Sequence, residues 1–258
     1  MQPPAEFSIA GVKINAIRVQ DLVEIVGDWI ARGRKEYVVL TGAHGVVEMQ
    51  TDDELRDINN RAGLVTPDGM PVVWIGRLKG HRTIEKVYAP SIMRALFAHG
   101  VGRQVRHYLY GGVEGVAETL KTRLEDEYPG IRIVGSYCPP FRPLAADEVR
   151  SLAQSINAAA PHIVWVGLGC PKQERWMHQF RPLLDANALI GVGAGFDFLS
   201  GRVRLAPRWI QNSGFEWAFR TLHDPRRLLK RYARVVPRFM YYGGQECLKE
   251  LAARLAGK

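Results

Sequence analysis

Three short apolar runs that end in glycines constrain the fold of this chain more than any other feature. They occupy residues 108–112, 162–169 and 189–195, and the first two lead into helical patterns. A continuous apolar run of this length, left through glycines, is typical of a strand covered on both faces, as in parallel sheets. Crossovers between such strands are right-handed and pack a helix back onto the sheet. The pattern therefore predicts an α/β fold, a Rossmann-like parallel sheet with helices on both faces.

The same alternation of strand and helix extends over most of the chain. Strands are expected at residues 7–17 (one or two short ones), 36–41, 64–66, 107–110, 131–136, 163–166 and 189–192, and helices at 21–31, 45–62, 72–78, 90–99, 114–127, 146–158 and 172–183. Composition turns basic and aromatic after residue 201, which divides the chain into a core, residues 1–201, and a C-terminal appendage, residues 202–258. Open α/β sheets bind ligands at the carboxyl ends of their strands. The residues expected at that edge are Thr41, Asp68, Gly111, Gly167 and Gly193.

The glycine turn after the second run is the best candidate for a diphosphate site. Gly167 and Gly169 let a phosphate approach the backbone, and Pro171 stands where a helix would begin. Backbone N–H groups at such a helix start attract anions. Gln173 and Glu174 come next, either as ligands for sugar hydroxyls or as part of a solvated helix face. The alternative for each glycine turn is an ordinary connection without a ligand.

Asp68 is the candidate for a catalytic base. Its carboxylate leaves a predicted strand end and is followed by Gly69, which permits close approach of a ligand. A carboxylate in that place can accept a proton from a bound hydroxyl, as inverting sugar transfer requires. The alternative is that Asp68 caps the following helix, a role worth about 1 kcal/mol. Thr41 stands at the matching end of the neighbouring strand.

Positive charge is concentrated near the C-terminus. The net charge of the chain is +9, and residues 202–238 hold ten Lys or Arg against two acidic residues, which gives 10 − 2 = +8 and leaves +1 for the rest. Residues 225–236 form a basic amphipathic helix, which Pro237 is expected to end or bend. Such a helix either packs on the core by its apolar seam or binds an anionic membrane surface. Residue types typical of membrane interfaces favour the membrane; they are Trp209, Trp217 and Tyr232.

The order of these motifs resembles the WecG/TagA/CpsF family of bacterial glycosyltransferases. Residues 167–174 match its G-x-G-x-P-K-Q-E turn, and residues 191–201 match its G-V-G-x-x-F-D-x-x-x-G turn. Residues 206–232 match its A-P-x-W…E-W…R…P-x-R…R-Y tail. The likeness extends from the first strand to about Phe239.

The resemblance implies inverting transfer of a sugar from a UDP-sugar donor to a polyprenyl-diphosphate-linked saccharide in surface or exopolysaccharide biosynthesis. Relatives transfer N-acetylmannosamine, its uronic acid or glucose, and the sequence leaves this choice open. The family's catalytic base corresponds to Asp68, and Thr41 is the second catalytic candidate. The appendage of relatives closes over the active site at the membrane and delivers arginines to the nucleotide. The residues expected to bind substrate or nucleotide are Lys86, Gly111, Gly112, Gly167, Gly169, Pro171, Gln173, Glu174, Gly193, Phe196, Arg220, Arg227 and either Lys230 or Arg231.

Two positions depart from the family pattern. Ala43 replaces the asparagine of a T-x-N motif, and the neighbouring His44 is either a replacement polar group or a structural residue. Lys86 keeps the positive charge of an R-V-x-G-x-D pattern, but Ser91 stands in place of its aspartate. These departures bear on the identity of the sugar more than on the type of reaction.

Two other functions fit parts of the sequence. Residues 191–195 imitate the glycine turn of an NAD-dependent oxidoreductase, but the third glycine comes one residue too early. The positive charge would suit a nucleic-acid-binding protein, yet no nucleic-acid module is recognisable, so no nucleic-acid partner is expected.

Neither a metal ion nor another cofactor is expected. The acidic clusters, residues 52–54 and 125–127, lie inside helical patterns rather than in a metal-binding loop. Three cysteines, Cys138, Cys170 and Cys247, favour a reducing compartment, and Cys170 is predicted to be a small buried residue. There is no apolar run of the roughly 20 residues that a membrane span needs, nor a signal pattern at the N-terminus. We therefore expect a cytoplasmic protein, peripheral on the inner face of the cell membrane, with homo-oligomers left open.

Overall fold

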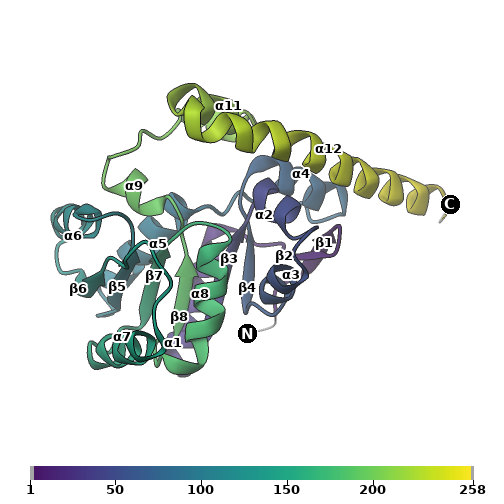
Figure 1. The fold of residues 1–258 in the computed structure, drawn as a ribbon. Coiled ribbons are helices and arrows are strands. Elements are labelled where there is room, and N and C mark those ends of the chain that lie inside the picture. The colour runs from purple at the N-terminus through teal and green to yellow at the C-terminus, as the bar shows by residue number, and fades with distance from the viewer. Residues whose placement is uncertain (1–2, 257–258) are drawn as a thin grey trace.

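The structure, a computed structural model, describes residues 3–256 and has an α/β architecture (Figure 1). One sheet contains six parallel strands in the order β4–β3–β8–β7–β5–β6. The bounds of the strands are β3 Glu36–Thr41, β4 Leu64–Pro67, β5 Arg106–Gly111, β6 Arg132–Tyr137, β7 Ile163–Gly167 and β8 Ala188–Gly191. The predicted Rossmann-like parallel sheet is therefore confirmed.

Helices cover both faces of this sheet, as predicted. Their bounds are α1 Val19–Ala31, α2 Ala43–Glu48, α3 Asp53–Asn60, α4 Met70–Leu78, α5 Ala89–Val101, α6 Val116–Glu127, α7 Ala146–Ala158, α8 Lys172–Phe180 with a short 3-10 turn Arg181–Leu183, α9 Gly195–Leu199, α10 Arg208–Asn212, α11 Glu216–His223 and α12 Pro225–Ala256. One core lies between the sheet and α2, α3, α4, α7 and α8, and a second lies between the sheet and α1, α5, α6 and α9.

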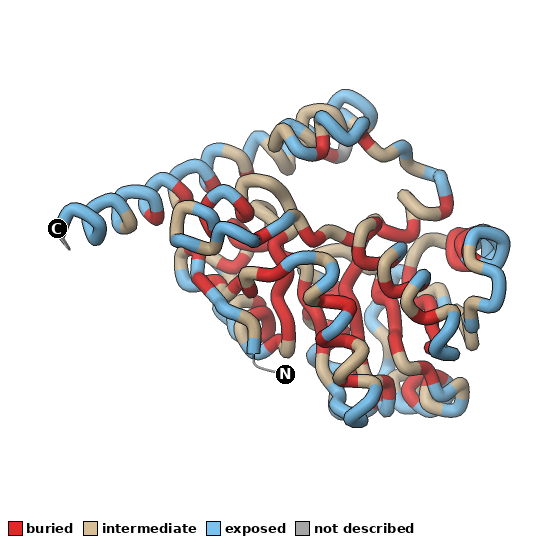
Figure 2. The backbone as a smooth tube through the Cα atoms, turned by 180° about the vertical axis from the view of Figure 1, so that it is seen from behind, coloured by how far each residue is buried: buried red, intermediate tan, exposed pale blue. Residues whose placement is uncertain are grey.

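Alternate residues of a central strand serve the two cores. In β7, Val164 and Val166 face the first core, whereas Ile163 and Trp165 face the second, and all four are fully buried. A strand that is covered on both faces needs apolar residues at every position, which explains the uninterrupted run in the sequence. The buried residues accordingly lie mostly in the middle of the molecule (Figure 2).

The first predicted strand region forms a separate antiparallel hairpin. It consists of β1 (Glu6–Ile9) and β2 (Val12–Asn15). Asn15 attaches the hairpin to the main sheet, because its side-chain oxygen accepts a 2.8 Å hydrogen bond from the backbone N–H of Val65. The hairpin extends the first core beyond β4 without adding a strand to the parallel sheet.

The predicted helix at residues 45–62 is instead two helices, α2 and α3. The break falls at residues 49–52, where Asp52 caps α3 by accepting a 2.9 Å hydrogen bond from the N–H of Leu55. An aspartate at a helix N-cap satisfies a backbone donor that the helix itself leaves unpaired. The sequence correctly predicted helical structure in this region. The N-cap at Asp52 divides it into two helices.

The C-terminal helix α12 continues through Pro237, so of the two predicted effects of this proline, an end or a bend of the helix, the first was wrong. Leu228, Val235 and Phe239 are buried, and the last two belong to the first core. The helix crosses over α2 and α4, and its C-terminal end extends past the sheet (Figure 1). Packing of its apolar seam therefore holds α12 in place across the proline. Within residues 3–256, we find no helix that combines the length and apolar character of a membrane span.

Candidate functional site

Asp68 lies at the carboxyl end of the edge strand β4, directly after four buried residues. Its N–H donates a 3.1 Å hydrogen bond to the carbonyl oxygen of Thr41, at the end of the neighbouring strand. Gly42 makes this approach sterically possible, because a Cβ atom there would lie 2.5 Å from the carbonyl oxygen of Asp68. The N-cap of α4 is Gly69, with a φ of 111°, so the capping alternative for Asp68 does not hold.

The pKa of the half-buried Asp68 carboxyl is raised to about 6. Burial is the main cause, and the negative charge of Glu216 adds to it, whereas Lys86, Arg220 and Arg231 oppose it. Three of these four charges belong to the C-terminal segment, residues 202–256. A carboxylate with a pKa slightly below neutral is ionised at pH 7 yet still basic enough to accept a proton, as a general base must be.

Thr41, the second catalytic candidate, has a structural contact. Its side chain is buried, and its hydroxyl donates a 2.6 Å hydrogen bond to the Oδ1 atom of Asn59. Together with the carbonyl contact to Asp68, this bond fixes the end of β3 beside the end of β4. A direct role for the Thr41 hydroxyl in catalysis stays a prediction.

The three glycine turns lie side by side at the same edge of the sheet. The N–H of Gly112 donates a 3.0 Å hydrogen bond to the carbonyl oxygen of Gly167. Gly111 has a φ of 110°, and a Cβ atom there would lie 2.7 Å from that same oxygen, so only glycine fits. Phe196 is buried beneath them, where its ring would meet a Cβ atom on Gly167 at 3.0 Å. The structure thus gives Phe196 a packing contact below the turns.

Gln173 joins two of these turns from the inside. Its Oε1 atom accepts hydrogen bonds from the N–H groups of Gly169, at 3.2 Å, and Gly193, at 2.8 Å. Its amide donates a 3.0 Å bond to Glu174, and both side chains are buried, with 4% and 1% of their surface exposed. The reading of Gln173 and Glu174 as a solvated helix face was therefore wrong. The N–H groups of Gly169 and Gly193, two residues predicted to bind substrate or nucleotide, are therefore occupied by Gln173.

Replacing Gln173 with methionine should destabilise the protein by roughly 2–5 kcal/mol, because it leaves two buried N–H groups without an acceptor at nearly constant side-chain volume. Gln179→Met, on the exposed side of the same helix α8, is the matched control and should change the free energy of unfolding by no more than about 0.5 kcal/mol. Urea unfolding of both variants measures the difference. Equal stabilities would show that the two turns do not depend on Gln173.

Cys170 and Pro171 complete the turn between β7 and α8. Pro171 is the N-cap of α8, close to its predicted place at the helix start. Burial raises the pKa of the half-buried Cys170 thiol far above its usual value, and the nearby Glu174 adds to the effect. Cys170 is therefore a neutral thiol, and it is half-buried rather than fully buried as predicted.

The basic tail residues that were predicted to bind the nucleotide differ in their exposure and in the groups on which their charges act. Lys230 is exposed, whereas Arg231 is half-buried, and its charge acts on Asp68, Cys170 and His44. The guanidinium of Arg220 lies 5.4 Å from the centre of the Phe198 ring and also acts on Asp68. Of the pair left open by the sequence, Arg231 is the residue on the side of the site. The side chain of Arg227 lies outside the described part of the structure.

Lys86 contacts the C-terminal segment. Its Nζ atom lies 3.1 Å from the Oε2 atom of Glu216 and donates a 3.2 Å hydrogen bond to the carbonyl oxygen of Gln211. The same ammonium group lies 4.1 Å from the centre of the Tyr88 ring. Our sequence reasoning missed Glu216, Gln211 and Tyr88, although Glu216 belongs to the E-W motif of the tail.

His44, which follows the position of the missing family asparagine, is neutral at pH 7. Burial lowers its pKa to about 4, and the charges of Arg231 and Arg234 contribute. Its Nε2 atom lies 3.4 Å from the Oε1 atom of Glu48, on the next turn of α2. Among residues 3–256, no group of three or more His, Cys, Asp or Glu side chains is arranged to hold a metal ion.

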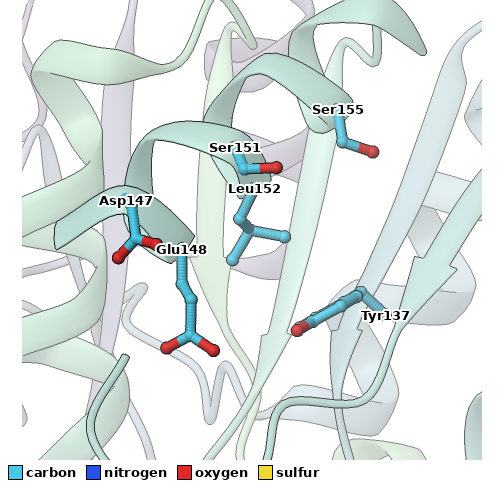
Figure 3. Close-up of a pocket in the computed structure, with 6 residues that line it drawn as sticks. All are labelled: Tyr137, Asp147, Glu148, Ser151, Leu152 and Ser155. Carbon is cyan, nitrogen blue, oxygen red and sulfur yellow. The ribbon is translucent and has the colours of Figure 1, made fainter. Parts of the chain in front are cut away.

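A surface pocket of about 380 Å³ lies between β6 and α7, away from this site (Figure 3). Its lining residues are Tyr137, Asp147, Glu148, Ser151, Leu152 and Ser155. Strand β6 is the opposite edge of the sheet from β4, so four strands separate the pocket from Asp68. The pocket therefore does not share residues with the cluster around Asp68.

Comparison with known proteins agrees with the motifs of the sequence. The model of the glycosyl transferase WecG/TagA/CpsF family matches residues 7–253. An N-acetylglucosaminyldiphosphoundecaprenol N-acetyl-beta-D-mannosaminyltransferase of Bacillus subtilis (strain 168) is 30% identical over 176 residues, which cover 68% of this chain and 67% of that protein. A protein of the same name from Bacillus spizizenii (strain ATCC 23059 / NRRL B-14472 / W23) is 28% identical over 200 residues, or 77% of this chain and 76% of that protein. Since the family match covers nearly the whole sequence, this chain belongs to the WecG/TagA/CpsF family of glycosyl transferases.

Proposed function

We propose that this glycosyl transferase moves a sugar from a UDP-sugar, with inversion and without a metal ion, to a polyprenyl-diphosphate-linked saccharide. The observation that carries the proposal is the half-buried carboxylate of Asp68, with a pKa raised to about 6, in the field of Lys86, Arg220 and Arg231. The names of the two Bacillus relatives specify an N-acetylmannosamine donor group and an N-acetylglucosaminyl diphosphoundecaprenol acceptor. We therefore favour N-acetylmannosamine over its uronic acid or glucose.

In the proposed reaction, Asp68 accepts the proton of the acceptor hydroxyl while the hydroxyl oxygen forms a bond to the anomeric carbon of the donor. The bond from that carbon to the diphosphate of UDP breaks on the opposite face, which inverts the configuration. Negative charge then grows on the departing diphosphate. Arg220 and Arg231 supply the opposite charge, as arginines do for phosphate groups in water-poor sites.

The C-terminal segment is the part that we propose to contact the membrane. Large apolar side chains of α10, α11 and α12 and the turn between them are exposed, including Trp209 at 73% and Leu222 at 80%, together with Phe215 and Leu229. Exposed arginines accompany them at Arg208 and Arg226. Apolar anchors beside positive charge suit the inner face of a membrane that contains anionic lipids. We thus retain the proposed division into a catalytic core, residues 1–201, and a membrane-associating appendage, residues 202–258.

The decisive experiment is a donor screen on the full chain. UDP-N-acetylmannosamine, UDP-N-acetylmannosaminuronic acid and UDP-glucose would each be mixed with N-acetylglucosaminyl diphosphoundecaprenol in anionic vesicles, and UDP release would be measured. We expect release that requires both donor and acceptor and is fastest with the first donor. Acceptor-independent release, or none with any UDP-sugar, would refute the proposed reaction.

Addition of EDTA should change the rate of UDP release by less than about twofold, because arginines, rather than a metal ion, would neutralise the departing diphosphate. The measurement is the rate after dialysis against EDTA, with and without added Mg²⁺ or Mn²⁺. A rate that falls at least tenfold and returns when a divalent ion is added would contradict metal independence.

A further inference from the structure

The loop before α5 is tied to the C-terminal segment by a compact set of polar contacts. Lys86 contacts Glu216 and the carbonyl oxygen of Gln211, and the Tyr88 hydroxyl donates a 2.6 Å hydrogen bond to the Oε1 atom of Gln211. The amide of Gln211 in turn donates a 2.6 Å bond to the carbonyl oxygen of Ala206. Three of these four contacts join residues that are 123 to 130 positions apart in the chain, and the fourth holds the side chain of Gln211 in place.

The Lys86 side chain is 8% exposed, and that of Glu216 is 24% exposed. A charge pair shielded to this degree is costly to break, because removal of one member leaves the other charge poorly solvated and unpaired. The pair therefore favours one placement of α11 against the core. Arg220 lies on the same helix as Glu216, one turn further along, so the placement of the pair also places Arg220.

Resting on the function proposed above, we propose that Lys86 and Glu216 are positioning residues, a pair that sets the balance of charge around Asp68 by docking α11 on the loop before α5. This role differs from nucleotide binding, which the sequence predicted for Lys86. The pair joins the core to the C-terminal segment, and its two charges act on the catalytic carboxylate with opposite signs.

Titration of Asp68 should distinguish the effect of the Lys86 charge from that of the Glu216 charge. The charges that act on its carboxylate are those of Glu216 and Arg220 on α11, Arg231 on α12 and Lys86 in the loop. The nearby Tyr88 has a raised pKa and His44 a lowered one, so both are neutral between pH 5 and 8. Loss of the Glu216 charge removes a cause that raises the pKa of Asp68 and leaves the Lys86 charge uncompensated. Loss of the Lys86 charge does the reverse.

The test compares Glu216→Gln, Lys86→Met and the double variant. In wild type, kcat/KM should rise with pH through an apparent pKa of about 6. We expect Glu216→Gln to move this acid limb to lower pH and Lys86→Met to move it to higher pH, each by roughly half a unit or more, and the double variant to return toward wild type. Two variants that only loosened the segment would move the limb in the same direction, and that result would overturn the proposal.

Glu246→Gln is the matched control. Glu246 on α12 pairs with Lys79, at 2.5 Å, and so ties the same loop region to the C-terminal segment without contributing to the pKa of Asp68. It should leave the acid limb in place.

A second readout separates failure of this proposal from failure of the proposed function. The carboxyl carbon of Asp68 can be titrated by NMR in the full-length chain with labelled aspartate, using Asp68→Asn to assign its signal. Opposite shifts of the Asp68 pKa in the two single variants would support the pair even if no donor were turned over. Equal or absent shifts would refute the pair even in an active enzyme.

Discussion

Asp68→Asn should lower kcat for sugar transfer by roughly 10²–10⁴-fold, the range that a general base contributes. Asparagine keeps the size and most of the hydrogen-bonding capacity of the side chain but cannot accept the proton of the acceptor hydroxyl. Donor affinity should therefore stay within a few fold of wild type. The rate is measured as UDP release at saturating donor and acceptor, and the donor affinity by titration calorimetry.

Asp185→Asn is the control for this substitution. Asp185 lies before the amino end of β8, at the other end of the strands from Asp68, and is mostly exposed. It should leave kcat unchanged. Turnover by Asp68→Asn at more than a tenth of the wild-type rate would remove Asp68 from the role of base.

The same substitution should affect stability in a pH-dependent way. Because the pKa of Asp68 is raised to about 6 in the folded protein, the folded state holds a proton that the unfolded state has already lost at that pH. The contribution of Asp68 to the free energy of unfolding therefore falls as pH rises from about 4 to 6 and stays reduced above that. At pH 8, Asp68→Asn should be more stable than wild type by up to about 3 kcal/mol. The gain is smaller to the extent that water solvates the carboxylate. At pH 4, the two proteins should have similar stability.

The second large effect is expected at Arg231. Arg231→Met should lower kcat/KM by roughly 10²–10³-fold, because it removes a fixed positive charge from the place where the diphosphate would depart. Lys230→Met is a closely matched control: it removes the same charge one residue earlier in α12, from an exposed side chain, and should cost less than about threefold. Both variants are assayed by UDP release across a series of donor concentrations.

Equal losses in the two variants would mean that the tail acts through its overall charge, for instance at the membrane, rather than through Arg231. Point substitutions are preferable to deletion of the segment after Gly201. Val235 and Phe239 of α12 belong to the first core, so deletion would expose apolar surface of α2 and α4.

Local pattern was sufficient to predict the sheet and its ligand edge. In β7 and β8, uninterrupted apolar residues followed by glycine have few alternative structures, and both strands lie within a residue or two of their predicted bounds. Asp68 and the glycine turns do lie at the carboxyl edge, because parallel strands bring these ends together whatever their order. The site predicted on this basis needed no knowledge of long-range contacts.

Contacts between segments that are distant in the sequence could not be predicted from local pattern. The sequence does not reveal that the polar side chain of Gln173 turns inward, because this depends on the N–H groups of Gly169 and Gly193 that meet it in the folded protein. Likewise, Lys86 and Glu216 are separated by 130 residues, and only the docking of α11 makes them partners. The course of α12 through Pro237 depends on the core beneath the helix, which overrides the local cost of an interior proline.

The uninterrupted course of α12 has a mechanical consequence. Its 32 residues form a helix of about 48 Å. Its middle part is held to the core by the pairs Arg234–Glu48 and Glu246–Lys79, with Val235 and Phe239 buried in the first core between them. Because the helix is continuous and its middle part is anchored, a force on one end is transmitted to these contacts instead of being absorbed at a break in the helix. Arg231 lies one turn before Arg234, so such a force would also act on the position of its guanidinium relative to Asp68.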